Sequence, residues 1–286
     1  MTATKEQTRK PNPAQIPIKN QMPNQLKEWF SPVRGDEHIL LGRDSPLRRV
    51  PINVTPKQAV FLDGIRHAIE VMDIGFGRLR IGLTKAALEP PHPPDLPLVG
   101  AGLFLDAWAV VDAIDRFRQF YLRFPGMTRS AASDQIPPLG ETLQTFRDLR
   151  NVGDHVVDRA DAVVAKGGAA LGELTWLTGA QILPEVVAWH CVLRPGTLRS
   201  EPALPSTPLE TTLDWPTDYI SLKAGGYQGN LSQVRIHIAG RIRHLEYQLN
   251  KTFSKPEYDG VPVMNDFFGR WPVSPSSAER DAKDSL

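Results

Sequence analysis

The stretch Arg150-Asn151-Val152-Gly153-Asp154-His155 holds the most specific combination of reactive side chains in this 286-residue sequence. A histidine titrates near neutral pH, so it can take up or release a proton during a reaction. An arginine keeps its charge and can bind a phosphate group through parallel hydrogen bonds. The segment therefore combines a proton carrier with a fixed cation and a polar amide between them.

This arrangement resembles the ribonuclease motif of the HEPN superfamily. In that motif four to six residues, the first of them usually polar, separate an Arg from a His. The segment 105–116 leads through Phe124-Pro125-Gly126 to the motif, in an order similar to that of uncharacterised bacterial HEPN-like proteins. The resemblance covers about residues 100–178, and members of the superfamily are small helical bundles, often dimeric, many of them RNA-cleaving toxins or antiviral effectors.

The resemblance implies a metal-independent endoribonuclease, a toxin or defence component that cleaves RNA by attack of its own 2′-hydroxyl. His155 would be the base or acid, Arg150 the phosphate clamp and Asn151 an orienting hydrogen-bond partner. Arg147 and Arg159 would contact RNA. No cofactor and no metal are expected, and the expected partners are RNA, a second copy of the chain, and an antitoxin or other protein.

One position departs from a toxin subgroup of the superfamily. There the motif continues with a Tyr two residues after the His, to which the antitoxin attaches nucleotides, whereas this chain has Val157. Regulation by that route is therefore not implied.

Helical spacing limits how the motif can act within one chain. Arg147, Asn151, His155 and Arg159 form one polar row on a helix, but Arg150 lies about 140° around the axis from His155. Either backbone distortion at Gly153 or a second subunit would have to bring Arg150 to His155. The hypothesis therefore requires a homodimer.

A different interpretation of the same row is a solvated helix face that does no chemistry. The opposite face is apolar, and charged residues on the outside of such a helix commonly serve solubility. The alternative function is then a non-catalytic helical module that binds another protein. The apolar residues opposite the row are Phe146, Leu149, Val152 and Val156.

Two other groups are weaker candidates. His190 and Cys191 lie on an expected strand without further metal ligands at suitable spacing, which favours a packing role. His237 and His244 share the last expected helix with several arginines, which leaves open both a basic patch for RNA and an ordinary solvated face.

Composition narrows the class of protein. With 41% hydrophobic and 23% charged residues the chain can bury a core without disulfides, and Cys191 is its only cysteine. A net charge of +1 excludes a whole-molecule field that would attract nucleic acid or an anionic membrane. Without an apolar leader or an uninterrupted apolar run of about 20 residues, we predict a cytoplasmic protein with no membrane contact.

Apolar periodicity predicts a mainly α protein, an antiparallel helical bundle with a small antiparallel β-sheet insertion before the last helix. Helices are expected at 55–88, 99–123, 138–165 and 231–253, and strands at 170–178, 185–193 and 211–222. The domains would be a disordered proline-rich lead (1–54), a HEPN-like helical domain (55–253) with the β insertion at about 170–222, and a largely disordered tail (254–286).

Overall fold

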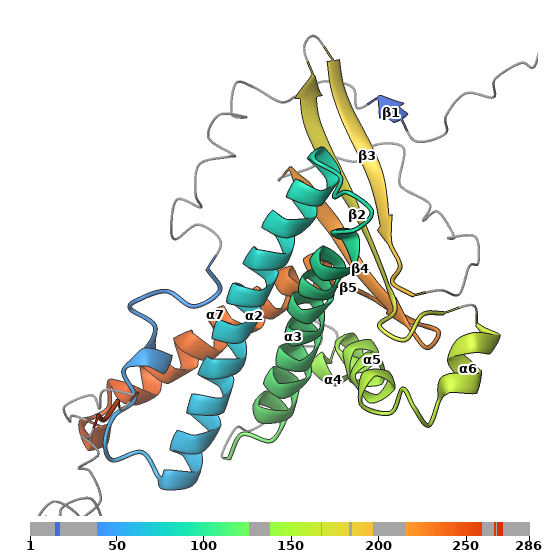
Figure 1. Ribbon diagram of the computed structural model, residues 1–286. Coiled ribbons are helices and arrows are strands. Elements are labelled where there is room, and N and C mark those ends of the chain that lie inside the picture. The colour runs from blue at the N-terminus through green and yellow to red at the C-terminus, as the bar shows by residue number, and fades with distance from the viewer. Residues whose placement is uncertain are drawn as a thin grey trace, which may run out of the picture.

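The computed structural model describes residues 15–17, 39–125, 138–166, 168–182, 185–196, 216–258, 266 and 268–270. It is mainly helical, with one small antiparallel sheet inserted before the last helix, as the sequence predicts (Figure 1). Two long helices lie side by side, and the sheet and the last helix pack against them.

Helix α2 (Pro56–Leu88) begins and ends where the sequence predicts. The Thr55 hydroxyl caps it by accepting a hydrogen bond from the Gln58 amide at 3.3 Å, and Pro56 occupies the first helical position. The helix ends before the run of prolines at 90–94, which cannot continue it.

Helix α3 (Leu96–Leu122) returns antiparallel to α2 and begins three residues earlier than expected. Glycines on α2 allow the close approach. A Cβ at Gly64 would lie 2.5 Å from the Phe120 ring, and one at Gly75 would lie 3.1 Å from Val110. Residue numbers rise along α2 from Gly64 to Gly75 and fall along α3 from Phe120 to Val110. These two contacts therefore also fix the antiparallel register of the helices.

Within the described ranges, α3 is the one helix long and apolar enough to cross a membrane by length and composition. Half of its most apolar window is buried inside the protein, and core helices of globular proteins meet the same criterion. Asp106 and Asp115 are buried on this helix, both in ion pairs. These features are compatible with a soluble protein.

The expected third helix is not continuous. It divides into α4 (Leu139–Thr142), α5 (Gln144–Asp154) and α6 (Ala160–Ala165), with turns at 155–159. The three- and four-residue apolar spacing continues past Asp154, but Val157 is 84% exposed, so no core is available to hold a helix there. The prediction of one helix through 165 was wrong.

The sheet has the strand order β1-β3-β2-β4-β5, and every described pairing is antiparallel. Its strands are β1 (Gln15–Pro17), β2 (Glu173–Ile182), β3 (Glu185–Leu193), β4 (Thr217–Ala224) and β5 (Tyr227–Asn230). The described part of the third expected strand begins at Thr217, and 197–215, which include its expected start at 211, lie outside the described residues. β1 and β5 were not predicted, because both are too short to show alternation.

The last helix, α7 (Leu231–Phe253), follows β5 directly. The Asn230 side chain caps it by accepting a hydrogen bond from the Gln233 amide at 2.8 Å. Helix α7 packs on β4 and on the short 3₁₀ helix η1 (Pro46–Arg48). The bounds of this helix agree with the prediction, and of the two candidate caps in the sequence, Asn230 and Ser232, Asn230 caps it.

Order begins upstream of the expected boundary at Thr55. Leu41, Leu47 and Val50 are buried in the main core, so the prediction of disorder through residue 54 was wrong for residues 39–54. Most of the expected tail lies outside the described residues, but η3 (Pro256–Tyr258) follows α7. Further on, Asp266 forms an ion pair with Arg66 of α2 at 2.6 Å.

Candidate functional site

The motif lies at the C-terminal end of α5, where this helix packs between α3 and the sheet. Phe146, Leu149 and Val152 form its buried face. Glycines in the sheet make room for that face: a Cβ at Gly229 would lie 2.9 Å from Leu149, and one at Gly225 would lie 2.6 Å from Val152. The apolar face predicted from the sequence therefore places α5.

Gly153 lets the end of α5 approach α3. A Cβ at this position would lie 3.0 Å from the Trp108 ring, closer than ordinary packing allows. The Trp108 indole N–H in turn donates to the Leu171 carbonyl at 3.1 Å, which joins α3 to the start of β2. Gly153 thus permits close packing at the point where the motif leaves the helix.

Arg150 is bound to carboxylates of α3. Its Nη1 donates to Asp115 at 3.0 Å, and its Nε lies 3.0 Å from Asp112 and 3.7 Å from Asp154. The hydrogen bond to Asp115 raises the pKa of Arg150, although burial acts in the opposite direction. Within the described part of the chain Nη2 makes no hydrogen bond, and the side chain is 30% exposed.

Asp115 is the centre of this ion-pair network and is only 2% exposed. Burial alone would raise its pKa, but hydrogen bonds from Arg118, Arg150 and Gln119 outweigh burial and hold the pKa below its usual value. The Arg118 and Gln119 contacts measure 2.8 Å and 2.6 Å. The carboxylate is therefore charged at neutral pH and fixes the orientation of Arg150.

His155 lies in the turn that follows α5, not on the helix itself. Its side chain is 58% exposed, and Nδ1 lies 3.7 Å from Asp158. No hydrogen bond or ion pair joins it to Arg150 among the described residues. One chain therefore does not bring Arg150 and His155 into contact.

The expected polar row is interrupted at the same place. Arg147 and Asn151 lie on α5, while His155 ends that helix and Arg159 caps α6. Arg147 and Arg159 are exposed and Asn151 is half-buried. In the part of the chain that the structure describes, none of these three side chains has a hydrogen-bond or ion-pair partner.

From the sequence, Asp112 and Asp115 could either assist a site or form an exposed helix face, and their pairing with Arg150 was not predicted. Asp112 and Asp115 precede Arg150 by 38 and 35 positions, so only packing of α5 on α3 reveals the pairing. Asp106 on the same helix serves elsewhere: it pairs with Arg78 at 3.1 Å, and burial, which outweighs that ion pair, raises its pKa.

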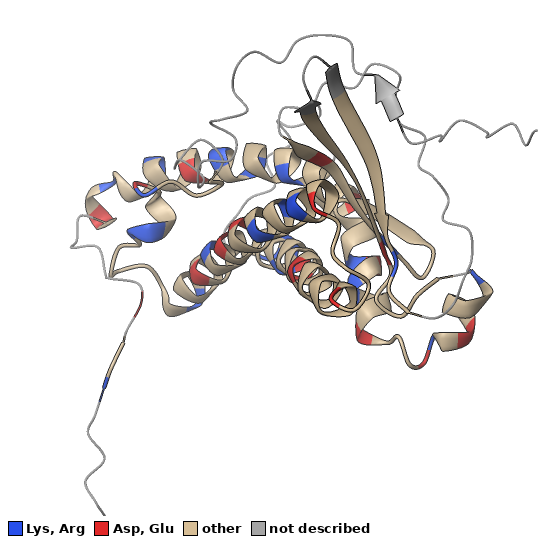
Figure 2. Cartoon of the chain, turned by 45° about the horizontal axis from the view of Figure 1, so that its top comes forward, with Lys and Arg blue, Asp and Glu red and all other residues tan. Residues whose placement is uncertain are grey.

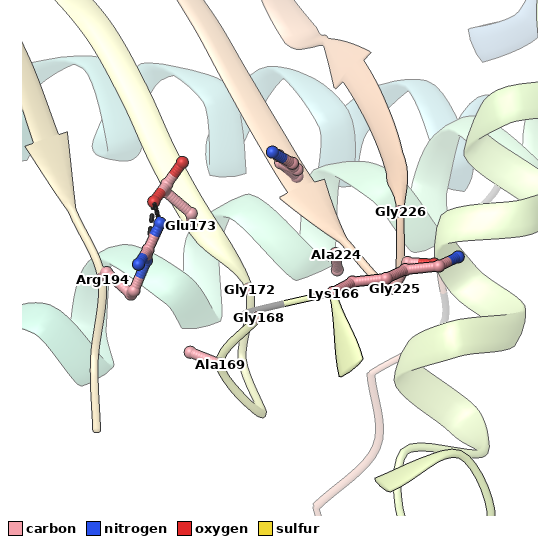
Figure 3. Close-up of a pocket in the computed structure, with 10 residues that line it drawn as sticks. Lys166, Gly168, Ala169, Gly172, Glu173, Arg194, Ala224, Gly225 and Gly226 are labelled. Carbon is pink, nitrogen blue, oxygen red and sulfur yellow. Dashed lines mark hydrogen bonds and ion pairs between the residues drawn. The ribbon is translucent and has the colours of Figure 1, made fainter. Parts of the chain in front are cut away.

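A hollow near α6 is lined by Lys166, Glu173, Arg194 and Lys223, together with turn glycines (Figure 3). Its volume of about 40 Å³ has room for a few water molecules and not for a nucleotide. Arg194 pairs with the buried Glu173 across it, with Nε at 2.7 Å, and Lys166 donates to the Gly225 carbonyl at 2.9 Å. These contacts hold the end of α6 and the neighbouring strands together, so the hollow has a structural explanation.

His190 and Cys191 lie on β3, opposite Leu177 and Trp176 of β2. Burial lowers the pKa of His190 and raises the pKa of the Cys191 thiol to about 11, so both are neutral at pH 7. No group of three or more potential metal ligands occurs within the described residues. The packing role expected for this pair agrees with these surroundings.

Comparison with known proteins gives little further information. No protein-family model and no solved structure matches the chain. It is similar to an arginine–tRNA ligase of Rhodopseudomonas palustris (strain HaA2), with 29% identity over 137 residues. The match covers 43% of this chain and 23% of the ligase, so the chain spans less than a quarter of that relative. The match is too distant and too partial to show a family.

Proposed function

We propose that the chain is a metal-independent endoribonuclease of HEPN type, a cytoplasmic toxin or defence component that acts as a homodimer. The supporting observation is the state of Arg150. Two carboxylates of α3 fix its guanidinium through Nε and Nη1, which leaves Nη2 able to donate to a phosphate oxygen. His155 follows five positions later on an exposed turn.

In this mechanism His155 takes the proton of a ribose 2′-hydroxyl as that oxygen bonds to the adjacent phosphorus. The bond from phosphorus to the 5′-oxygen breaks, which leaves a 2′,3′-cyclic phosphate, and the 5′-oxygen takes a proton from water. Asp158, near Nδ1 of His155, orients the ring so that Nε2 faces the substrate. Arg150 stabilises the charge that grows on the phosphate oxygens. Asn151 orients the substrate by hydrogen bonding, and Arg147 and Arg159 bind flanking phosphates.

The proposal includes a second subunit because one chain keeps Arg150 and His155 apart. In a two-fold dimer that packs the α5 ends together, Arg150 of one subunit would act with the equivalent histidine of the other. The helical part of the HEPN-like bundle would consist of α2, α3 and α5. The ligase match adds nothing to the mechanism, although its name refers to an RNA substrate.

The acidic surroundings of Arg150 favour a second candidate, a non-catalytic module that binds another protein. Asp112, Asp115 and Asp154 already balance the charge of Arg150. In addition, large apolar side chains are exposed on the α2–α3 hairpin, as is common at protein interfaces. They include Ile74, Ile81, Leu98 and Leu105, which are between 58% and 82% exposed.

Cleavage of mixed single-stranded RNA in the presence of EDTA tests the first candidate. We expect the wild type to cleave and His155→Ala to lose activity by about 100-fold or more, as for loss of a general base. Arg150→Lys should lose activity too, since it keeps the charge beside Asp115 but not the guanidinium donors. His92→Ala is the matched control, because it removes an exposed histidine from a loop, and this variant should cleave RNA normally.

The outcomes separate the candidates. Activity that persists in both motif variants would place cleavage at another site or in a contaminant. A pure, folded wild type without activity would reject the nuclease proposal for these RNAs and leave the binding module. Sedimentation of the wild type checks the dimer independently, because a monomer at working concentration contradicts a shared site.

A further inference from the structure

Helix α7 presents a basic solvent face that the proposed mechanism does not use. We define the α7 face as the exposed side chains of Ile236, His237, Arg243, His244, Tyr247 and Lys251. His237, His244 and Lys251 recur every seven positions, which keeps them on one side of the helix. The face runs from Ile236 to Lys251, about 23 Å along the 23-residue helix.

The opposite side of α7 fixes this orientation. Six apolar residues of the helix are buried against β4 and the rest of the core: Leu231, Val234, Ile238, Ile242, Leu245 and Leu249. Arg235 points to α2, where it pairs with Asp73 at 2.7 Å. Because the buried side is anchored along its whole length, the α7 face is a rigid surface and not a frayed end.

The positive charge of this face comes from Arg243 and Lys251, in a chain whose net charge is only +1. The other two cations of α7 are engaged elsewhere, Arg235 with Asp73 of α2 and Arg241 with Tyr121 of α3. The helix has one acid, Glu246. Figure 2 marks these residues in blue and red. Glu246 lies about 160° around the helix from His244 and about 60° from Arg243, at the edge of the face. In the described part of the chain, no ion pair or hydrogen bond engages the side chains of Arg243 or Lys251.

The face also carries an exposed aromatic ring between its two cations. Tyr247 is 63% exposed and lies four positions, about one turn, from both Arg243 and Lys251. Cations that bind phosphates, interleaved with an aromatic ring that stacks on an unpaired base, form the pattern that recognises single-stranded nucleic acid. Anionic lipid would match the charge, but Ile236 and Tyr247 alone provide little apolar surface to insert into a bilayer.

We propose that the α7 face binds single-stranded RNA, with Arg243 and Lys251 on backbone phosphates and Tyr247 stacked on a base. This inference deepens the proposed ribonuclease function by naming a docking surface for its substrate. It concerns binding, so it can hold or fail separately from cleavage at Arg150 and His155.

Binding is measured in the full chain carrying His155→Ala, so that the RNA probe stays intact. Fluorescence anisotropy with a labelled single-stranded RNA gives Kd at several salt concentrations. Arg243→Gln with Lys251→Gln should weaken binding and lower the slope of log Kd against log salt by about 1.4, or 0.7 for each phosphate contact. Tyr247→Ala should weaken binding about fivefold or more at every salt concentration.

The matched control is Lys57→Gln with Lys85→Gln, which removes the same charge from exposed positions of α2. Equal effects of the two double variants would show a general charge effect and reject the α7 face. Absence of RNA binding by the His155→Ala parent would also reject the proposal. Binding of the chain to vesicles that contain anionic phospholipid, without binding to RNA, would reject it as well. If the α7 variants bind poorly while wild-type cleavage is absent, the binding surface stands and the nuclease proposal falls.

Discussion

Individual charges in this protein act through partners distant in the sequence. Arg150 was predicted as a phosphate clamp, and in the structure α3 engages it through Asp112 and Asp115. The residue types of the motif were readable from the sequence, whereas these ion pairs depend on how α5 packs. A sequence pattern could indicate the chemistry available, and only the fold shows which hydrogen-bond donors remain for a ligand.

Asp115 should set the acid sensitivity of the fold. Its pKa lies below the usual value in the folded state, so its contribution to stability is present above about pH 4 and is lost as pH falls through the folded-state pKa. Asp115→Asn should lower the free energy of unfolding at pH 7 by roughly 1–3 kcal/mol and flatten its dependence on pH below 4.

Urea unfolding across this pH range measures both effects. Asp112→Asn is the control, because the Asp112 side chain is 37% exposed and should contribute less than about 1 kcal/mol. If the two variants lose equal stability, Asp115 is not the centre of the network.

At the scale of elements, the sequence predicts helices where a long apolar face and a cap coincide. Helices α2 and α7 have both, and their bounds were correct. The expected third helix had the spacing but lacked a core beyond Asp154, so it divides. β5, with Gly229 packed under α5, has no alternating pattern to reveal it. Burial by a neighbouring element, which a single sequence does not show, decides these cases.

The α2–α3 contact offers a paired test of close packing. Gly64→Ala should destabilise the protein by about 1–3 kcal/mol, because the added methyl group would overlap the Phe120 ring. Gly77→Ala, on the same helix with open space around it, should instead stabilise by about 0.5–1 kcal/mol. Thermal and urea unfolding measure the change in the free energy of unfolding for both variants. If the two changes had the same sign, the proposed helix contact would be contradicted.

For the molecule as a whole, segments that look disordered in the sequence contribute contacts to the folded domain. Leu47 is fully buried under α7, and Asp266 reaches back 200 positions to Arg66. The hydrogen bond from Arg66 holds the pKa of Asp266 below its usual value. Proline-rich composition masked these contacts, because isolated anchoring residues leave no periodic signal.

Asp266→Ala should lower the melting temperature, since the Arg66 side chain, only 3% exposed, would lose one of its carboxylates. Glu257→Ala serves as the control, because its exposed side chain lies 4.0 Å from Lys255 and forms no other ion pair among the described residues. Differential scanning calorimetry compares them, and an unchanged melting temperature in Asp266→Ala would show that this contact adds nothing to the fold.

The single cysteine has a practical consequence for chemical labelling. With its pKa near 11, the Cys191 thiol is almost wholly protonated at neutral pH and should react slowly with maleimides. A cysteine introduced at exposed His155 or Tyr247 would then carry a probe selectively, without a cysteine-free background. At position 155 such a thiol would also report on assembly, because oxidation would link two chains only where their α5 ends meet.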